Sequence, residues 1–319
     1  MWPPRAPCPP SPSSPRVCVF GEALVDEMPS GPVPGGAPLN VAAHAAAFGL
    51  EPLLLTRLGA DDAGTALRAR LAAVGVPTDG VQEDTRRPTG PAVVSLRGGL
   101  PRFEIPSGTA FDAIDGAVAA RAAQAWRPSV VAFGTLAQRE PVSRTALCEV
   151  LSATKAVCLA DLNLRPPWYD GSVVCRALAA ADVVKVSDEE LVEVRRLLSL
   201  PRNDLEDLSA YVVRRFRLRA LYVTRGAKGA YVATWNDGQV VSFAEASAQA
   251  PGEVVVDTVG AGDAFTATVL LGLVRGWTAE ESLRHGVGFA GAVTRIRGAV
   301  PSDPGFYVPF LEEWGCMAA

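Results

Sequence analysis

Histidine is nearly absent from this chain, which has two in 319 residues, and none of its six cysteines forms a Cys-x-x-Cys pair. Structural zinc sites are usually built from closely spaced cysteines and histidines, so the sequence argues against such a site. A chain of this length does not need disulfides to hold its core, and we expect the cysteines to be free thiols.

Long apolar runs and an excess of positive charge are also missing. The longest apolar candidate, residues 264–274, falls short of the roughly 18 residues that span a bilayer, and no membrane partner is expected. Seven of the first fifteen residues are proline, without an apolar signal segment. We therefore expect residues 1–16 to be a disordered proline-rich arm and the protein to be cytoplasmic. The net charge of −4 argues against nucleic acid as a partner.

Apolar residues make up 49% of the chain, which is enough for a sizeable core. Short apolar runs alternate with segments of helical spacing through most of the sequence. This alternation predicts βαβ units and a mainly parallel sheet, hence an α/β fold in one large domain. The expected strands are 17–21, 53–58, 129–134, 157–161, 182–186 and 220–224, and the expected helices include 39–48, 191–198, 205–216 and one after Asp61 and Asp62.

Residues 85–107 break the alternation. The runs 91–97 and 102–105 are separated by a Gly-Gly-Leu-Pro turn and predict a β-hairpin. A hairpin inserted into an α/β scaffold indicates a lid over a site at the strand ends. Its apolar residues would let it pair with a second copy, so a homodimer through the lid is one expectation.

The strongest chemical signal is Asp257-Thr-Val-Gly-Ala-Gly-Asp-Ala-Phe265. We expect a strand at 253–256 before it and a buried helix at 264–274 after it. A glycine-rich turn at a helix N-terminus offers backbone N–H groups and partial positive charge to a phosphate. Phe265 stands where a dinucleotide fingerprint needs glycine, and no Gly-Lys-Ser/Thr follows. The motif therefore argues against a Rossmann oxidoreductase and against a Walker P-loop.

Asp263 lies at the start of the expected helix, beside the anion pocket. A carboxylate there can accept a hydroxyl proton while the amides of the turn hold a transferring phosphoryl group. This constellation indicates a small-molecule kinase, and the alternative interpretation is an ordinary aspartate N-cap.

A second cluster lies near the N-terminus. Asp26 follows the first strand, and Gly35, Gly36 and Asn40 lie at the start of a helix. A carboxylate and an amide suit a polyol, because the former accepts from hydroxyls and the latter both donates and accepts. Turn chemistry is the alternative, since loops commonly use these residue types.

Over residues 17 to about 310 the chain resembles the ribokinase-like, or PfkB, carbohydrate kinases. The resemblance rests on Gly-Gly-x-x-x-Asn at 35–40 and Asp-x-x-Gly-Ala-Gly-Asp at 257–263, in that order. Segments 21–26, 57–62 and 161–168 are most similar to the fructokinase branch. The resemblance implies a three-layer sandwich with a mainly parallel central sheet and a small β lid, built from residues 17–319 with lid elements near 26–36 and 85–107.

The resemblance also implies an ATP-dependent sugar kinase that uses Mg²⁺ and, as in many members, a monovalent cation such as K⁺. By likeness, Asp263 is the catalytic base, Gly260, Ala261 and Gly262 form the anion hole, and Arg165 lies near the transferring phosphate or the sugar. Sugar-binding positions are Asp26, Gly35, Gly36, Asn40, Phe103, Asp161 and Asn163. Nucleotide-binding positions are Lys185, Ser187, Thr224, Gly226, Gly229 and Val287, while Glu190 holds Mg²⁺ through water and Asp257, Val293, Gly298 and Ser302 hold the monovalent cation.

Local structure offers other interpretations of some of these positions. Residues 188–190 suit an acidic first helical turn, residues 224–229 suit a hairpin turn, and residues 297–302 suit a turn built from glycine and proline. Ser187 also replaces the asparagine of the family pattern. His44 and His285 are expected to be packed or surface helical residues rather than bases.

The substrate predicted by the resemblance is D-fructose, converted to fructose 6-phosphate. Segment 103–111 matches the fructokinase pattern least, so 2-keto-3-deoxygluconate, another ketose or a nucleoside remain alternatives. Arg165 would suit an acidic sugar as well as a phosphate. A non-catalytic sugar- or nucleotide-binding regulator is a further alternative, which the intact Gly-Ala-Gly-Asp argues against.

Overall fold

The structure is a computed structural model that describes residues 16–28, 31–97, 100–201, 204–236, 240–247 and 254–316. The expected proline-rich arm lies outside these ranges except for Arg16. That residue opens the first strand of the sheet, so it is not the last residue of an arm.

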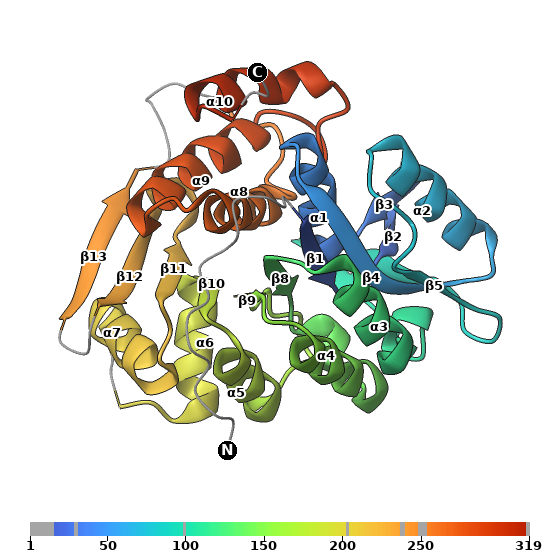
Figure 1. The fold of residues 1–319 in the computed structure, drawn as a ribbon, viewed down its shortest axis with the longest axis horizontal. Coiled ribbons are helices and arrows are strands. Elements are labelled where there is room, and N and C mark those ends of the chain that lie inside the picture. The colour runs from blue at the N-terminus through green and yellow to red at the C-terminus, as the bar shows by residue number, and fades with distance from the viewer. Residues whose placement is uncertain are drawn as a thin grey trace.

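A nine-stranded sheet forms the centre of the described molecule, in the order β13-β12-β11-β10-β9-β8-β1-β4-β5 (Figure 1). Neighbours from β11 to β5 pair in parallel, and β12 and β13 add an antiparallel edge. The strands are β1 (Arg16–Phe20), β4 (Glu51–Gly59), β5 (Val81–Asp84), β8 (Val130–Phe133), β9 (Val157–Asp161), β10 (Val183–Ser187), β11 (Ala220–Thr224), β12 (Ala230–Asn236) and β13 (Val240–Ala246).

Helices cover both faces of this sheet, which makes the three layers seen in Figure 1. Along β1, Cys18 and Phe20 belong to one apolar core and Val17 and Val19 to the other, as expected for a strand buried on both faces. One side of the sheet carries α3 (Gly116–Trp126), α4 (Pro141–Ala153), α5 (Gly171–Ala180), α6 (Asp188–Leu198) and α7 (Leu205–Phe216). The other side carries α1 (Ala37–Ala47), α2 (Asp62–Ala73), α8 (Ala261–Arg275), α9 (Ala279–Val293) and α10 (Val308–Glu313).

The six strands expected in the parallel part of the sheet are all present, with ends shifted by a few residues. The strand expected at 253–256 is wrong, because residues 254–257 belong to no strand. Their apolar content does not reflect burial: Val254 is 76% exposed. The backbone N–H groups of Val256 and Asp257 donate to the carbonyl of Thr294 after α9 instead of to a strand.

A separate four-stranded sheet, in the order β3-β2-β6-β7, contains the segments from which a lid is expected, and we refer to it as the lid. Its strands are β2 (Leu24–Met28), β3 (Gly31–Gly35), β6 (Gly90–Arg97) and β7 (Leu100–Glu104). The predicted hairpin is therefore confirmed as the antiparallel pair β6–β7. The turn residues 98 and 99 lie outside the described ranges.

The root of the lid is held by hydrogen bonds just before β6 begins. The carboxylate of Asp61 caps α2 and accepts from both the N–H and the hydroxyl of Thr89, at 2.8 and 2.7 Å. The hydroxyl of Thr89 in turn accepts from the N–H of Gly59 at 2.9 Å. The residue before the lid is thus fixed to the end of β4.

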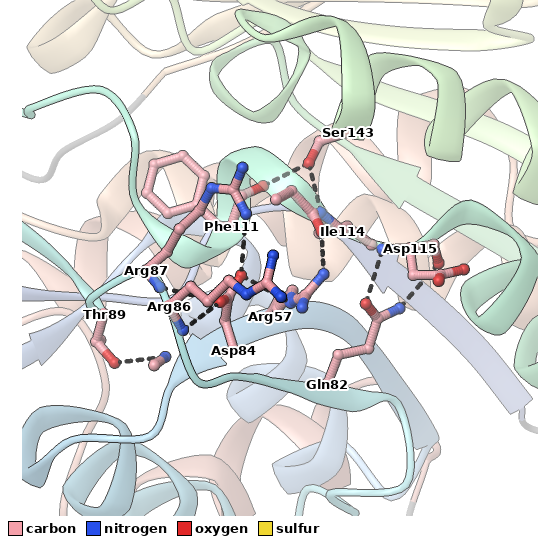
Figure 2. A network of polar contacts seen from close by, with 12 residues as sticks. Arg57, Gln82, Asp84, Arg86, Arg87, Thr89, Phe111, Ile114, Asp115 and Ser143 are labelled. Atoms are coloured by element: carbon pink, nitrogen blue, oxygen red, sulfur yellow. Dashed lines mark hydrogen bonds and ion pairs between the residues drawn. The ribbon is translucent and has the colours of Figure 1, made fainter.

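Figure 2 shows how a second part of the root is fixed. Arg57 forms an ion pair with Asp84 at 3.1 Å and donates to the carbonyl of Ala113 at 2.7 Å. The hydroxyl of Ser143 donates to the carbonyl of Phe111 at 2.6 Å and accepts from the N–H of Ile114. These bonds tie the chain on either side of the lid to α4 and to the edge of the central sheet.

Within the described residues, the structure also bears on the cysteines and on membrane-spanning helices. The five cysteines within these residues, at 18, 148, 158, 175 and 316, form no disulfide. In the same part of the chain no helix is both long and apolar enough to cross a membrane.

His44 is a packed residue of α1, in agreement with one of the two roles expected for it. Its ring is fully buried against Phe289, its Nδ1 lies 2.9 Å from the hydroxyl of Tyr307, and its Nε2 lies 3.0 Å from the carbonyl of Ala299. Burial lowers the pKa of the ring to about 4, although the hydrogen bond to Ala299 opposes this. The folded protein therefore keeps His44 neutral.

We expect His44 to make the fold sensitive to acid. The unfolded ring takes up a proton below its ordinary pKa of about 6.5 while the folded ring does not, so stability present above that pH is lost toward pH 4. The difference corresponds to about 3 kcal/mol in the free energy of unfolding. Urea titrations at pH 7 and 4.5 should show a smaller loss in His44→Gln than in the unaltered protein. His285→Gln is the comparison: burial also lowers the pKa of this partly exposed ring, but by less, so the loss should shrink less than in His44→Gln. An unchanged loss in His44→Gln would contradict the assignment.

Candidate active site

Nine of the residues predicted for catalysis or binding line one pocket of about 350 Å³ beneath the lid. The pocket opens beyond the carboxyl ends of the parallel strands, where ligands of open α/β sheets bind. The nine residues are Asp26, Gly36, Asn40, Asn163, Arg165, Lys185, Gly260, Gly262 and Asp263. Ala92 and Ile105 at the root of the lid also line it, and we call it the lid pocket.

A second pocket of about 300 Å³ lies between the β11–β12 turn and helices α8 and α9. Its lining includes all of Thr224, Gly226, Gly229, Ala261 and Val287, which the sequence assigned to the nucleotide or to the anion hole. We call it the turn pocket. Thr258 and Gly262 line both pockets, so the two meet at the glycine-rich turn.

The glycine-rich turn enters α8 through Gly260, which adopts a left-handed φ of 80°. A Cβ at this position would lie 2.3 Å from the side chain of Ala299, so only glycine fits. Asp257 fastens the turn, because its carboxylate accepts from the N–H groups of Val259 and Gly298, each at 3.0 Å. Gly260 and Gly262 line the lid pocket, and Ala261 and Gly262 line the turn pocket, so the N-terminus of α8 lies where the two pockets meet.

Asp263 is the third residue of α8 and not its N-cap, since Gly260 holds that position. The alternative of a simple capping aspartate is therefore wrong. Its Oδ2 accepts a hydrogen bond of 2.8 Å from Nδ2 of Asn40, which lies 223 residues earlier on α1. Burial raises the pKa of the Asp263 carboxyl, and the Asn40 hydrogen bond opposes the rise. Asn40 thus orients a carboxylate that has more affinity for a proton than an exposed aspartate.

Lys185 places a positive charge beside the turn. Its Nζ lies 3.0 Å from where a Cβ on Gly262 would be, and donates to the two carboxylate oxygens of Asp161 at 3.1 and 3.3 Å. Burial disfavours the charged form, but nearby carboxylates, Asp161 foremost, outweigh it and raise the pKa of Lys185. Asp161 itself accepts from the hydroxyl of Thr266 at 2.7 Å and lies behind Lys185, outside the lid pocket. The sequence assigned Asp161 to the sugar, whereas in this structure its carboxylate binds Lys185.

Asp26 of β2 lies against the glycine pair at positions 35 and 36, which begins the Gly-Gly-x-x-x-Asn motif. A Cβ on Gly35 would come within 2.3 Å of the Asp26 carboxylate, so this glycine makes room for it. Burial raises the pKa of the Asp26 carboxyl to about 6, with Arg165 lowering it and Asp263 raising it. The carboxyl groups of Asp26 and Asp263, both of raised pKa, therefore share the lid pocket with Arg165.

Ser187 and Glu190 form a capping box at the start of α6. One oxygen of Glu190 accepts from the N–H of Ser187 at 2.8 Å and the other from the N–H of Leu164 at 2.6 Å. The interpretation of residues 188–190 as an acidic first helical turn is thus confirmed. Each oxygen keeps one lone pair that a water molecule bound to a metal can use.

The remaining predicted positions are scattered or not described. The side chain of Phe103, on β7, lies outside the description. Val293 is buried in the core below α9 and Ser302 is exposed in the loop after it. Three residues that the sequence did not single out also take part: Glu22 lines the lid pocket, Thr258 lines both pockets, and Thr266 supports Asp161. Only Glu22 had a signal, as a carboxylate directly after the first strand.

Comparisons with known proteins identify the family. Residues 29–304 match the model of the pfkB family of carbohydrate kinases. The chain is 32% identical to a fructokinase of Escherichia coli over 278 residues, which cover 82% of this chain and 85% of that protein.

Solved structures give the same result for the fold. The structure of a fructokinase from Xylella fastidiosa with bound ATP superposes with a TM-score of 0.81 at 23% identity, covering 95% of this chain and 99% of that one. A fructokinase from Vibrio cholerae O395 with fructose, ADP and calcium superposes with a TM-score of 0.75 at 25% identity, covering 93% and 99%. The fold is therefore the ribokinase-like α/β fold that the sequence predicted, and the chain belongs to the pfkB family of carbohydrate kinases.

Proposed function

We propose that this protein is an ATP-dependent fructokinase that transfers the γ-phosphate of ATP to the 6-hydroxyl of D-fructose. The observation that carries the proposal is the position of Asp263, which lines the lid pocket next to Gly262 of both pockets and is hydrogen-bonded to Asn40 at 2.8 Å. Support for the sugar comes from the relatives, which are named fructokinases.

In this mechanism the sugar occupies the lid pocket and ATP the turn pocket. Asp263 accepts the proton of the attacking hydroxyl, while Asn40 holds the carboxylate in place. Backbone N–H groups of the glycine-rich turn and the ammonium of Lys185 stabilise negative charge on the transferring phosphoryl group. Arg165, which lines the same pocket, adds positive charge there. The lid covers the sugar and limits hydrolysis of ATP by water.

Magnesium fits this site as a companion of the nucleotide. Among the described residues no group of three or more histidines, cysteines, aspartates or glutamates could hold a metal on its own. Mg²⁺ commonly keeps several waters and binds through substrate phosphates and one or two carboxylates, where it neutralises phosphate charge. Glu190 is the carboxylate we assign to it, through water. The monovalent cation would take oxygen ligands from Asp257, Val293, Gly298 and Ser302.

A homodimer through the lid remains a prediction, and the outer lid strand β3 restricts how it could form. Pro32 and Pro34 lie two residues apart on β3, opposite Glu27 and Val25 of β2. Both prolines lack an N–H group, so the outer edge of β3 lacks two donors that an added strand would need. A second copy would have to pair with β7 or with a face of the lid.

The test is a panel of sugars with Mg·ATP, followed by production of ADP. The panel contains D-fructose, other ketoses, a nucleoside and 2-keto-3-deoxygluconate, each with and without K⁺. We expect D-fructose to give the highest kcat/KM and the phosphorylated product to carry phosphate at the 6-position. A higher kcat/KM for any other sugar would overturn the assignment of fructose, and ATP hydrolysis unaffected by all of them would overturn the kinase assignment.

A further inference from the structure

Glu22 is a buried acidic residue that none of the contacts above explains. It lies between β1 and β2, and its side chain is 5% exposed. The carboxyl oxygen Oε2 has no hydrogen-bond partner among the described residues. A buried polar atom without a partner costs about 1–3 kcal/mol, so such an atom at the wall of a pocket points to a ligand.

The backbone around Glu22 fixes where this carboxyl lies. The backbone of Glu22 passes so close to Gly36 that a Cβ there would lie 2.8 Å from the Glu22 carbonyl oxygen. The side chain lines the lid pocket together with Asp26, Asn163 and Asp263. It also lines a small cavity of about 20 Å³ behind that pocket, which shares Asn163 and Leu136 with it. Glu22 thus belongs to the inner wall of the lid pocket.

We propose that Glu22 is a sugar-binding residue whose free carboxyl oxygen forms a hydrogen bond with a hydroxyl group of the substrate and so contributes to substrate selection. The assignment rests on the proposed function of the lid pocket as the sugar site. A carboxyl group suits a polyol in either state, because the acid donates through its O–H and the carboxylate accepts.

The charges that face Glu22 come from several elements. Burial raises the pKa of its carboxyl to about 7, and Asp263 of α8 adds to the rise, whereas Arg165 after β9 and Arg139 before α4 lower the pKa. Asp26 of β2 and Lys185 of β10 line the same pocket. Near neutral pH, both states of Glu22 are therefore populated, and the bond to the sugar changes from donated to accepted as the pH rises.

Three variants test the proposal on whichever sugar the unaltered protein phosphorylates. Glu22→Leu removes both hydrogen-bonding states, and we expect KM for the sugar to rise about 10- to 100-fold while KM for ATP changes less than about twofold. Glu22→Gln keeps the size of the side chain and a hydrogen-bond donor. Its KM for the sugar should therefore lie between those of the unaltered protein and Glu22→Leu. Glu27→Gln, at an exposed residue of β2, is the control and should match the unaltered protein.

Monodeoxy sugars that retain the accepting hydroxyl identify the bond. For fructose, one of the 1-, 3- and 4-deoxy analogues should raise KM in the unaltered protein and have no further effect in Glu22→Leu. A purely structural role for Glu22 predicts the same relative loss for every analogue in both proteins, and that result would overturn the proposal. The sugar panel decides the proposed function separately, because it uses the unaltered protein alone.

The pH dependence gives an independent readout that does not need the leucine variant to fold. In the unaltered protein, KM for the sugar should change near pH 7, and in Glu22→Gln this inflection should vanish while the one near pH 6 from Asp26 remains. An inflection near pH 7 that persists in Glu22→Gln would refute the assignment.

Discussion

Asp263→Asn should reduce kcat by roughly 10²- to 10⁴-fold, the usual contribution of a general base. The substitution keeps the size of the side chain, and the amide oxygen still accepts from Asn40, so the local structure is preserved. What it removes is the ability to take the proton of the attacking hydroxyl. Initial rates with saturating sugar and ATP measure the loss, and calorimetry should show that both substrates bind within a few-fold of the unaltered affinity.

A helix-dipole effect could also lower activity, because Asp263 places a negative charge in the first turn of α8. Asp207→Asn controls for this, since Asp207 is likewise the third residue of its helix, α7, but is exposed. Its kcat should be unchanged. If Asp263→Asn kept a near-normal kcat, the base would have to be another group and the proposed mechanism would be wrong.

The pH profile follows from the same carboxyl. Because burial raises the pKa of Asp263, the base is lost by protonation at a higher pH than for an exposed aspartate. We therefore expect kcat/KM to fall as the pH drops, with Asp26 contributing a second loss near pH 6.

The parts of the fold and site that local sequence signals specify were predictable. Buried strands such as Val157–Asp161 are short apolar runs. The turn Gly260-Ala-Gly-Asp263 at the start of a helix is also formed by residues that are adjacent in the sequence. The mistaken strand at 253–256 shows the limit of this reasoning, because three adjacent valines suit a strand wherever they occur. In the fold, the antiparallel strands β12 and β13 already occupy that edge of the sheet, and the valines are left exposed.

The contacts that make the site work join residues far apart in the chain. Asn40 and Asp263 are 223 positions apart, and Thr266 and Asp161 are 105 apart. No spacing rule connects such pairs, so the sequence assigned Asn40 to the sugar from its amide chemistry and from the resemblance, and Asp161 from the resemblance alone. The structure places Asn40 in the lid pocket and also against the base, whereas Asp161 lies outside that pocket against Lys185.

The second large effect is expected at Arg139, which joins the lid to the body. Its side chain is 2% exposed and binds Asp112 through two N–H···O bonds of 2.7 and 2.8 Å. It also donates to the carbonyls of Ile105 and Pro106, just after the lid strand β7. The guanidinium lies over the rings of Phe111 and Trp168, at 4.8 and 4.5 Å from their centroids. One side chain thus holds the returning end of the lid.

Arg139→Met should lower the free energy of unfolding by about 3–5 kcal/mol, because it leaves the carboxylate of Asp112 buried without its cation. It should also raise KM for the sugar more than KM for ATP, since Ile105 lines the lid pocket and not the turn pocket. Arg139→Lys keeps the charge but loses the paired hydrogen bonds and the ring stacking. Its stability and its KM for the sugar should therefore lie between those of the unaltered protein and Arg139→Met. Urea unfolding and initial rates measure both effects.

The matched control is Arg196, which makes the same two-bond contact with Glu193, at 2.7 and 2.6 Å, but with a side chain 66% exposed. Arg196→Met should lower the free energy of unfolding far less than Arg139→Met does, because exposed ion pairs contribute little. Equal losses in the two variants would mean that burial and the lid contacts of Arg139 add nothing. If Arg139→Met lost much stability but kept the KM for the sugar, this arginine would stabilise the fold without positioning the lid.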